Sequence, residues 1–97
     1  MEILRFSLSG HAGFAPRGRD IVCAAASVLM TTCVNALESV AEVVPLVELG
    51  DGRMALTLPA NIGRKAEATA QIILRTGLQG FEDLSSAYPK HFTILAK

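Results

Sequence analysis

The sequence predicts an α+β domain built as a two-layer sandwich, in which two helices pack on a largely antiparallel sheet. Three observations support this fold. Short stretches alternate between apolar and polar residues, two longer stretches repeat apolar residues at three- and four-residue steps, and a glycine-rich turn joins two neighbouring strands. The predicted order is strand, helix, strand, strand, helix, strand. With 97 residues the chain can form one core, so we expect a single domain over residues 1–97.

The first strand is expected at residues 3–9, where Leu4, Phe6 and Leu8 alternate with polar residues and should face the core. The first helix is expected to run from Asp20, a good N-cap residue, to about residue 40. This helix is apolar around most of its circumference, so it must be covered on more than one side. The sheet would cover one side, and a second subunit is the natural candidate for the other.

A hairpin is expected next. Residues 43–49 are rich in β-forming residues, a strong turn signal occupies residues 50–52, and residues 53–59 alternate again. Pro45 predicts that the first of these strands lies at a sheet edge or starts late, because proline cannot donate to the ladder.

The second helix is expected over residues 64–87, and a final strand over residues 92–96. Gly77 and Gly80 weaken this helix and predict either close packing or a kink. Its core-facing stripe comprises Ala66, Ala70, Ile73, Gly77, Phe81 and Leu84.

The composition argues against nucleic-acid binding and against a membrane span. Half of the residues are apolar and the formal net charge is zero, whereas a nucleic-acid-binding protein normally carries a clear basic excess. We therefore expect no direct nucleic-acid binding, and a neutral, apolar chain also favours a buried subunit interface. The apolar run at residues 21–37 is interrupted by serine, threonine and asparagine, which makes it too short and too polar for a membrane span. Without a visible secretory signal, the expected location is cytoplasmic.

Cys23 is the candidate reactive residue, because it falls in the first turn of the predicted first helix. Amide groups there lack helical partners and the helix dipole is positive, so a thiolate is favoured. His11 lies across a glycine-rich loop and is a candidate acceptor for the thiol proton. Two considerations oppose this pairing: free cysteine is commonly a buried apolar residue, and the negative charge of Asp20 disfavours a nearby thiolate.

The remaining cysteine is expected to be a structural residue, and the remaining histidine a surface residue. Cys33 lies ten residues after Cys23 in the same predicted helix, roughly 15 Å along its axis, so an intrachain disulfide is excluded. We expect Cys33 to be a core thiol and His91 a surface residue. Together with His11 these residues do not have zinc-ligand spacing, and no phosphate-binding glycine motif is present, so neither a metal nor a nucleotide cofactor is expected.

Three segments carry a family resemblance: residues 9–12 (SGHA), 18–27 (GRDIVCAAAS) and 35–38 (NALE). The sequence resembles the ribosomal-processing cysteine protease family of bacteria over essentially its whole length, including the Tyr-Pro pair near its end. The departures are Ala26, where the family pattern has valine, and Cys33, which matches no family feature.

The resemblance implies a cysteine endopeptidase that removes the N-terminal extension of a bacterial large-subunit ribosomal protein, L-twenty-seven. Cys23 would then be the nucleophile and His11 the general base. It also implies a homodimer, and an apolar groove beside the loop for the aromatic residues that precede the cut in the family's substrates.

Two further residues are candidates for supporting roles. Asp20 either caps the helix only or orients the imidazole as the third member of a triad. Ser27 lies one turn after Cys23, where its hydroxyl would bond near the thiol or back to the Cys23 carbonyl. The backbone amides of Val22 and Cys23 are the expected oxyanion donors.

The loop over residues 12–18 is expected to close over the substrate, because nearby glycines let it move. The residues assigned to this substrate loop are Gly10, Ala12, Gly13, Phe14 and Gly18.

Two other functions remain open from the residues alone. One is a non-catalytic ribosome-assembly or protein-binding module in which Cys23 is a core thiol. The other is a thiol-based redox protein, which is disfavoured because no second cysteine of the chain can reach Cys23.

Overall fold

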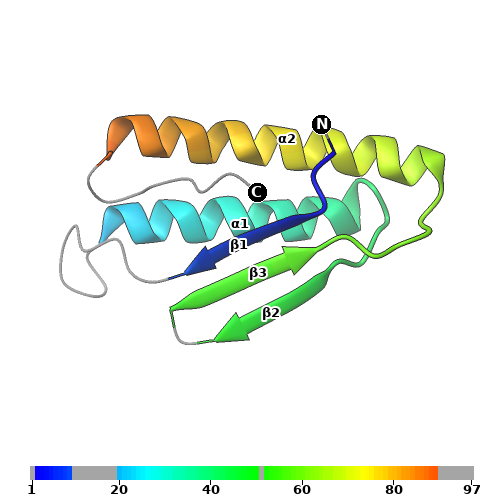
Figure 1. The fold of residues 1–97 in the computed structure, drawn as a ribbon, viewed down its shortest axis with the longest axis horizontal. Coiled ribbons are helices and arrows are strands. Elements are labelled where there is room, and N and C mark those ends of the chain that lie inside the picture. Colours follow the sequence, from blue (N-terminus) through cyan, green and yellow to red (C-terminus); the bar gives the residue numbers. More distant parts are fainter. Residues whose placement is uncertain (1, 10–19, 51, 90–97) are drawn as a thin grey trace.

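We analysed the fold in a computed structural model that describes residues 2–9, 20–50 and 52–89. These residues form two helices and three strands in the predicted order (Figure 1). The sixth predicted element, a strand at residues 92–96, lies outside the described residues. The elements are β1 (Arg5–Ser9), α1 (Ile21–Ser39), β2 (Leu46–Gly50), β3 (Arg53–Thr57) and α2 (Arg64–Ala87).

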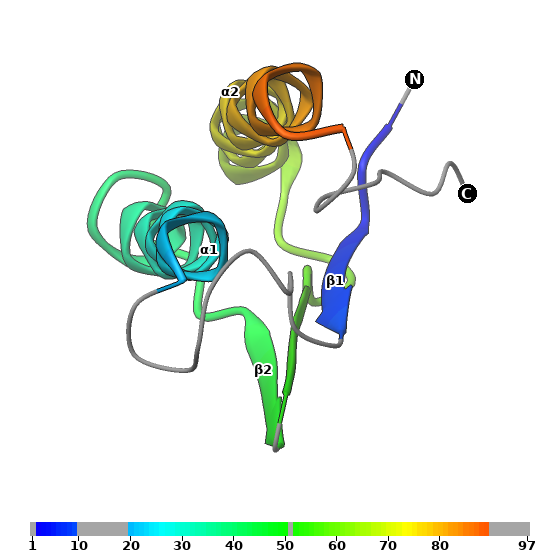
Figure 2. The same cartoon turned by 90° about the vertical axis from the view of Figure 1, so that its left-hand side faces the viewer.

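The three strands form an antiparallel sheet in the order β1-β3-β2. Both helices lie on one side of this sheet, which confirms the predicted two-layer α+β sandwich (Figure 2). We call the side facing the helices the helix-side face and the opposite one the outer face. The helix-side residues of β1 and β3, Phe6, Leu8, Met54 and Leu56, all belong to the core or pack against it.

The start of β1 differs from the prediction. Leu4 is 55% exposed, whereas Ile3 is buried. The amide side chain of Gln71 explains this, because it accepts a hydrogen bond from the Ile3 N–H (2.8 Å) and donates one to the Ile3 carbonyl (2.6 Å). This contact holds Ile3 against α2 before the regular alternation of β1 begins.

Strand β2 starts at Leu46, directly after Pro45, and lies at an edge of the three strands described. The proline therefore has both predicted effects. All five residues of β2 are exposed. Figure 2 shows that β2 lies at the end of the sheet farthest from α2.

Helices α1 and α2 pack closely where α2 carries glycine. A Cβ atom added at Gly77 would overlap the sulfur of Cys33 and approach Phe6 to 3.3 Å, and one added at Gly80 would approach Leu29 to 2.7 Å. Of the two predicted effects, close packing is the one confirmed at these glycines, within a helix that is continuous from Arg64 to Ala87. The predicted stripe of α2 is buried or half-buried throughout.

Helix α1 packs against α2. Helix α1 is long and apolar enough to cross a membrane by length and composition only. Core helices share these two properties, and the apolar stripe of α1 is buried inside this fold. The buried residues are Val22, Ala26, Met30, Cys33 and Leu37.

Candidate active site

Asp20 is the N-cap of α1. Its backbone is extended (φ −78°, ψ 99°) and its side-chain Oδ1 accepts a hydrogen bond of 2.9 Å from the Cys23 N–H. This confirms the capping role of Asp20 and fixes Cys23 as the third residue of the helix. It also corrects one expectation: the Cys23 N–H is already bonded to the cap, so it is not an available oxyanion donor.

The two cysteines have different environments. Both are free thiols, but Cys23 is half-buried, whereas Cys33 is 4% exposed. Burial raises the pKa of the Cys33 thiol and keeps it protonated. The prediction of Cys33 as a core thiol is therefore confirmed, while Cys23 has the partial exposure that a reactive thiol requires. The non-catalytic alternative required Cys23 to be the buried one.

The side of α1 on which Cys23 lies follows from helix geometry. Helix α2 contacts the flank of α1 that carries Leu29 and Cys33. Successive helical residues are rotated by about 100°, so Cys23 and Ser27 lie on the opposite flank of the buried stripe. This flank is therefore the one turned away from α2, which lies above α1 in Figure 2, whereas β2 lies below it.

Ser27 is exposed and shares this flank with Cys23, as its spacing predicted. Within the part of the chain that the structure describes, its hydroxyl makes no hydrogen bond, including none to the Cys23 carbonyl. The bond back to that carbonyl, which we had considered, is thus absent.

The start of α1 lies at the same end of the fold as the end of β1 and the turn between β2 and β3 (Figure 1). Strand β1 ends at Ser9, two residues before His11 in the sequence. His11 lies outside the described residues, and so do the five residues assigned to the substrate loop, namely Gly10, Ala12, Gly13, Phe14 and Gly18.

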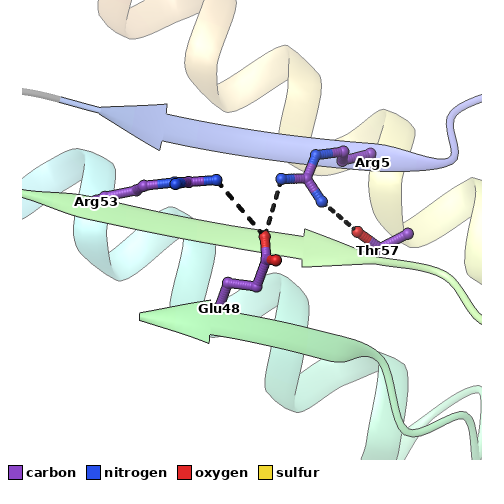
Figure 3. A network of polar contacts seen from close by, with 4 residues as sticks. All are labelled: Arg5, Glu48, Arg53 and Thr57. Carbon is purple, nitrogen blue, oxygen red and sulfur yellow. Dashed lines mark hydrogen bonds and ion pairs between the residues drawn. The ribbon is translucent and has the colours of Figure 1, made fainter. Parts of the chain in front are cut away.

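The charges of the sheet lie on its outer face, a feature that the sequence analysis missed. Glu48 forms ion pairs with Arg5 (3.0 Å) and Arg53 (3.8 Å), and Arg5 also donates a hydrogen bond to Thr57 (2.7 Å; Figure 3). The hydrogen bond and the charge of Arg5 lower the pKa of Glu48. The alternation of these residues with apolar ones along each strand was the signal available in the sequence.

The helix-side face of β2 is apolar and largely uncovered. Val47 lies opposite Leu56 and Leu49 opposite Met54, which places both on the helix-side face. Val47 is 39% exposed and Leu49 is 76% exposed. The helix-side face of β2 is therefore an apolar part of the sheet from which the charged side chains point away.

Comparisons with known proteins agree on one family. A family model described as cysteine protease Prp matches residues 1–93. The ribosomal processing cysteine protease Prp of Bacillus subtilis (strain 168) is 29% identical over 94 residues, which cover 95% of this chain and 84% of that protein.

Solved structures give the same picture. The essential ribosomal processing protease Prp from S. aureus, in complex with a covalently linked product peptide, superposes with a TM-score of 0.86 at 26% identity, covering 99% of this chain and 89% of that one. The protein SMU.848 from Streptococcus mutans superposes with a TM-score of 0.78 at 34% identity, covering 93% and 79%.

Proposed function

This chain belongs to the family of the cysteine protease Prp, and on that basis we propose that it removes the N-terminal extension of the bacterial ribosomal protein L-twenty-seven by means of a Cys–His pair. Membership makes the chain a cysteine protease of the ribosomal-processing type, so the non-catalytic and redox alternatives are not retained. The identity of the substrate and the roles of individual residues are our proposal.

The observation that carries the residue assignment is the position of Cys23. Its half-buried side chain stands in the first turn of α1, at the N-terminal end of the helix. Cys33, the other thiol, is sealed in the core and held in its protonated form. Of the two cysteines only Cys23 is accessible to a peptide.

The proposed reaction proceeds in two steps. His11 takes the thiol proton of Cys23 while the sulfur attacks the scissile carbonyl carbon, and the imidazolium then gives that proton to the departing amine. A water molecule, deprotonated by His11, attacks the resulting thioester, releasing the new carboxylate and returning the thiol. The end of β1 at Ser9 supports this assignment, because it leads the chain toward His11 from the same end of the fold.

Asp20 and Ser27 are proposed as supporting residues. Asp20 caps the helix through its side chain and would, in addition, orient the imidazole of His11. Ser27 stands one turn behind Cys23 with an exposed hydroxyl, which is available to a bound peptide. We also propose that the substrate loop of residues 12–18 closes over the peptide, and that the enzyme is a cytoplasmic homodimer.

The direct test incubates the protein with the extended ribosomal protein from the same genome and reads the new N-terminus by mass spectrometry. Cleavage is expected with the native chain and with Cys33→Ala, whereas Cys23→Ser and His11→Ala should leave the substrate intact. If Cys23→Ser still cleaves, the assignment of the nucleophile is wrong. An intact substrate with the native chain would remove the ribosomal protein as the substrate.

A further inference from the structure

We propose that the solvent-facing side of α2 binds the same side of α2 in a second copy of this chain, with the two helices antiparallel. This inference rests on the homodimer included in the proposed function and adds the surface through which the copies meet. We call this surface the α2 outer surface. It is defined by six exposed residues: Arg64, Lys65, Ile72, Arg75, Glu82 and Asp83.

The α2 outer surface is a single, uncovered side of the helix. Successive helical residues are rotated by about 100°, and this places all six residues within about 100° of the circumference of α2. The buried residues of α2, which include Leu74 and Phe81, lie on the opposite side. Figure 2 shows α1 and the sheet below α2, so the side above it is open. A partner could therefore approach the full length of the helix.

The charges of this surface are arranged against the dipole of α2. Arg64 and Lys65 occupy the first turn, where a helix favours acidic side chains. Glu82 and Asp83 lie near the other end, where basic side chains are favoured. Glu67, the acidic residue of the first turn, is half-buried and lies outside this surface. Among the residues that the structure describes, none of the four surface charges forms an ion pair. A partner with the opposite order of charges would neutralise both ends.

A second, antiparallel copy of α2 supplies that order of charges. About five full turns separate Arg64 from Glu82, and likewise Lys65 from Asp83, so each pair shares one flank of the helix. Equal flanks face each other in an antiparallel pair with twofold symmetry. If the axis crosses α2 between residues 73 and 74, Arg64 lies within about 1.5 Å, along the helix, of Glu82 of the partner subunit. Lys65 lies equally close to Asp83 of the partner subunit. Each end of the contact thus brings two basic residues against two acidic ones.

Ile72 lies at the centre of this contact. Its side chain is 68% exposed, and the same axis places it about 4.5 Å along the helix from its own counterpart. A single exposed isoleucine is ordinary on a protein surface. Here, however, it stands between two charged ends, which is the arrangement of an apolar contact with a polar rim. Association would remove both Ile72 side chains from water.

Arg75 makes the one unfavourable contact. It would lie about 4.5 Å along the helix from Arg75 of the partner subunit, on the same flank, and the two like charges would repel each other. Removal of this charge should therefore strengthen association, which is the opposite of the effect expected at the helix ends.

This interface leaves the proposed nucleophile accessible. Cys23 lies on the flank of α1 that is turned away from α2. Two copies joined through α2 therefore keep both Cys23 side chains away from the contact. The value of kcat per subunit should consequently stay the same whether the copies are associated or apart.

Sedimentation equilibrium of the native chain measures the Kd of self-association, which should rise between about 0.05 M and 0.5 M salt because the contact is charged. Lys65→Glu and Asp83→Lys should each raise Kd by about tenfold, since each places like charges at both ends of the contact. The double variant Lys65→Glu/Asp83→Lys restores opposite charges and should return Kd to within about threefold of the native value. Arg75→Gln should lower Kd by about threefold. Val28→Ser is the control, because it alters an exposed residue of α1 (64%) and should leave Kd unchanged.

The outcomes separate this inference from the proposals on which it rests. Unchanged Kd in both single charge variants overturns it, and so does a double variant as weak as the singles. Dissociation by Val28→Ser alone would assign the interface to α1, which refutes the inference and keeps the homodimer. A native chain that stays monomeric at every concentration removes both. A fall in kcat that accompanies dissociation would place the interface at the active site, contrary to the inference. Cleavage by the native chain and loss of cleavage in Cys23→Ser test the protease assignment independently of Kd.

Discussion

Gly77→Ala should destabilise the protein, because the added methyl group has no space between the helices. Its Cβ would overlap the sulfur of Cys33 and lie 3.3 Å from Cε2 of Phe6. Both neighbours belong to the packed interior: Cys33 is buried, and the ring of Phe6 is held edge-on against Phe81 at 5.5 Å between centroids. Neither can move aside without displacing a further core residue.

The magnitude follows from two opposing terms. Overpacking a well-filled core costs about 1–3 kcal/mol, and the overlap here places the cost at the upper end of that range. Replacing glycine by alanine inside a helix returns about 1 kcal/mol. The expected net loss is about 2 kcal/mol in the free energy of unfolding, or a fall of roughly 8–16 °C in Tm for a domain of this size.

Urea unfolding followed by circular dichroism measures this loss, and Gly80→Ala is the matched control. The added Cβ at Gly80 would meet the terminal methyl carbons of Leu29, which is half-buried, so its side chain can rotate away. Its stability should stay within about 1 kcal/mol of the native value. In a double-mutant cycle, Cys33→Ala should relieve more than 1 kcal/mol of the Gly77→Ala penalty, as expected for residues in contact (about 0.5–3 kcal/mol). A Gly77→Ala protein as stable as the native chain, or a cycle without coupling, would refute this account of the helix interface.

Three other predictions concern the thiols, the cap and the outer face. Iodoacetamide at neutral pH should alkylate Cys23 in the folded protein and leave Cys33 unmodified until urea unfolds the chain; equal labelling of both would contradict their different burial. Asp20→Ala should lower stability by about 1 kcal/mol through loss of the cap, whereas Asp20→Asn should keep it; if Asn also retains full kcat, Asp20 serves as a cap only. Glu48 has a folded-state pKa below its ordinary value of 4.5, so its charge stabilises the fold above about pH 4.5 and this contribution disappears as the pH falls through the lowered pKa. Glu48→Gln should therefore destabilise the protein at pH 7 but not at pH 2, as measured by thermal unfolding.

Features that depend on local chemistry were predictable from the sequence. The start of α1 follows from the capping preference of Asp20, and the late start of β2 follows from the missing N–H of Pro45. The burial of Cys33 was expected from the statistics of free cysteine. Each of these depends on a residue and its immediate neighbours.

Features that depend on distant segments were not predictable. The burial of Ile3 in place of Leu4 results from hydrogen bonds to Gln71, which is 68 residues away. The packing of α2 against α1 depends on the glycine contacts between the two helices. The exposure of the helix-side face of β2 depends on where the helices lie, which no local pattern in the sequence gives. The family resemblance gave His11 and the loop residues their expected roles, but no local pattern could place them in space.

The strand order has a consequence for how newly made copies become active. Strand β1 pairs with β3, so Arg5 lies opposite Thr57, and Ile3 is held by Gln71. A nascent chain emerging from the ribosome therefore exposes β1 and Cys23 long before their partners have been synthesised, since pairing across such a separation must wait for the distant segment. Proteolytic activity should consequently arise only after Gln71 has been synthesised.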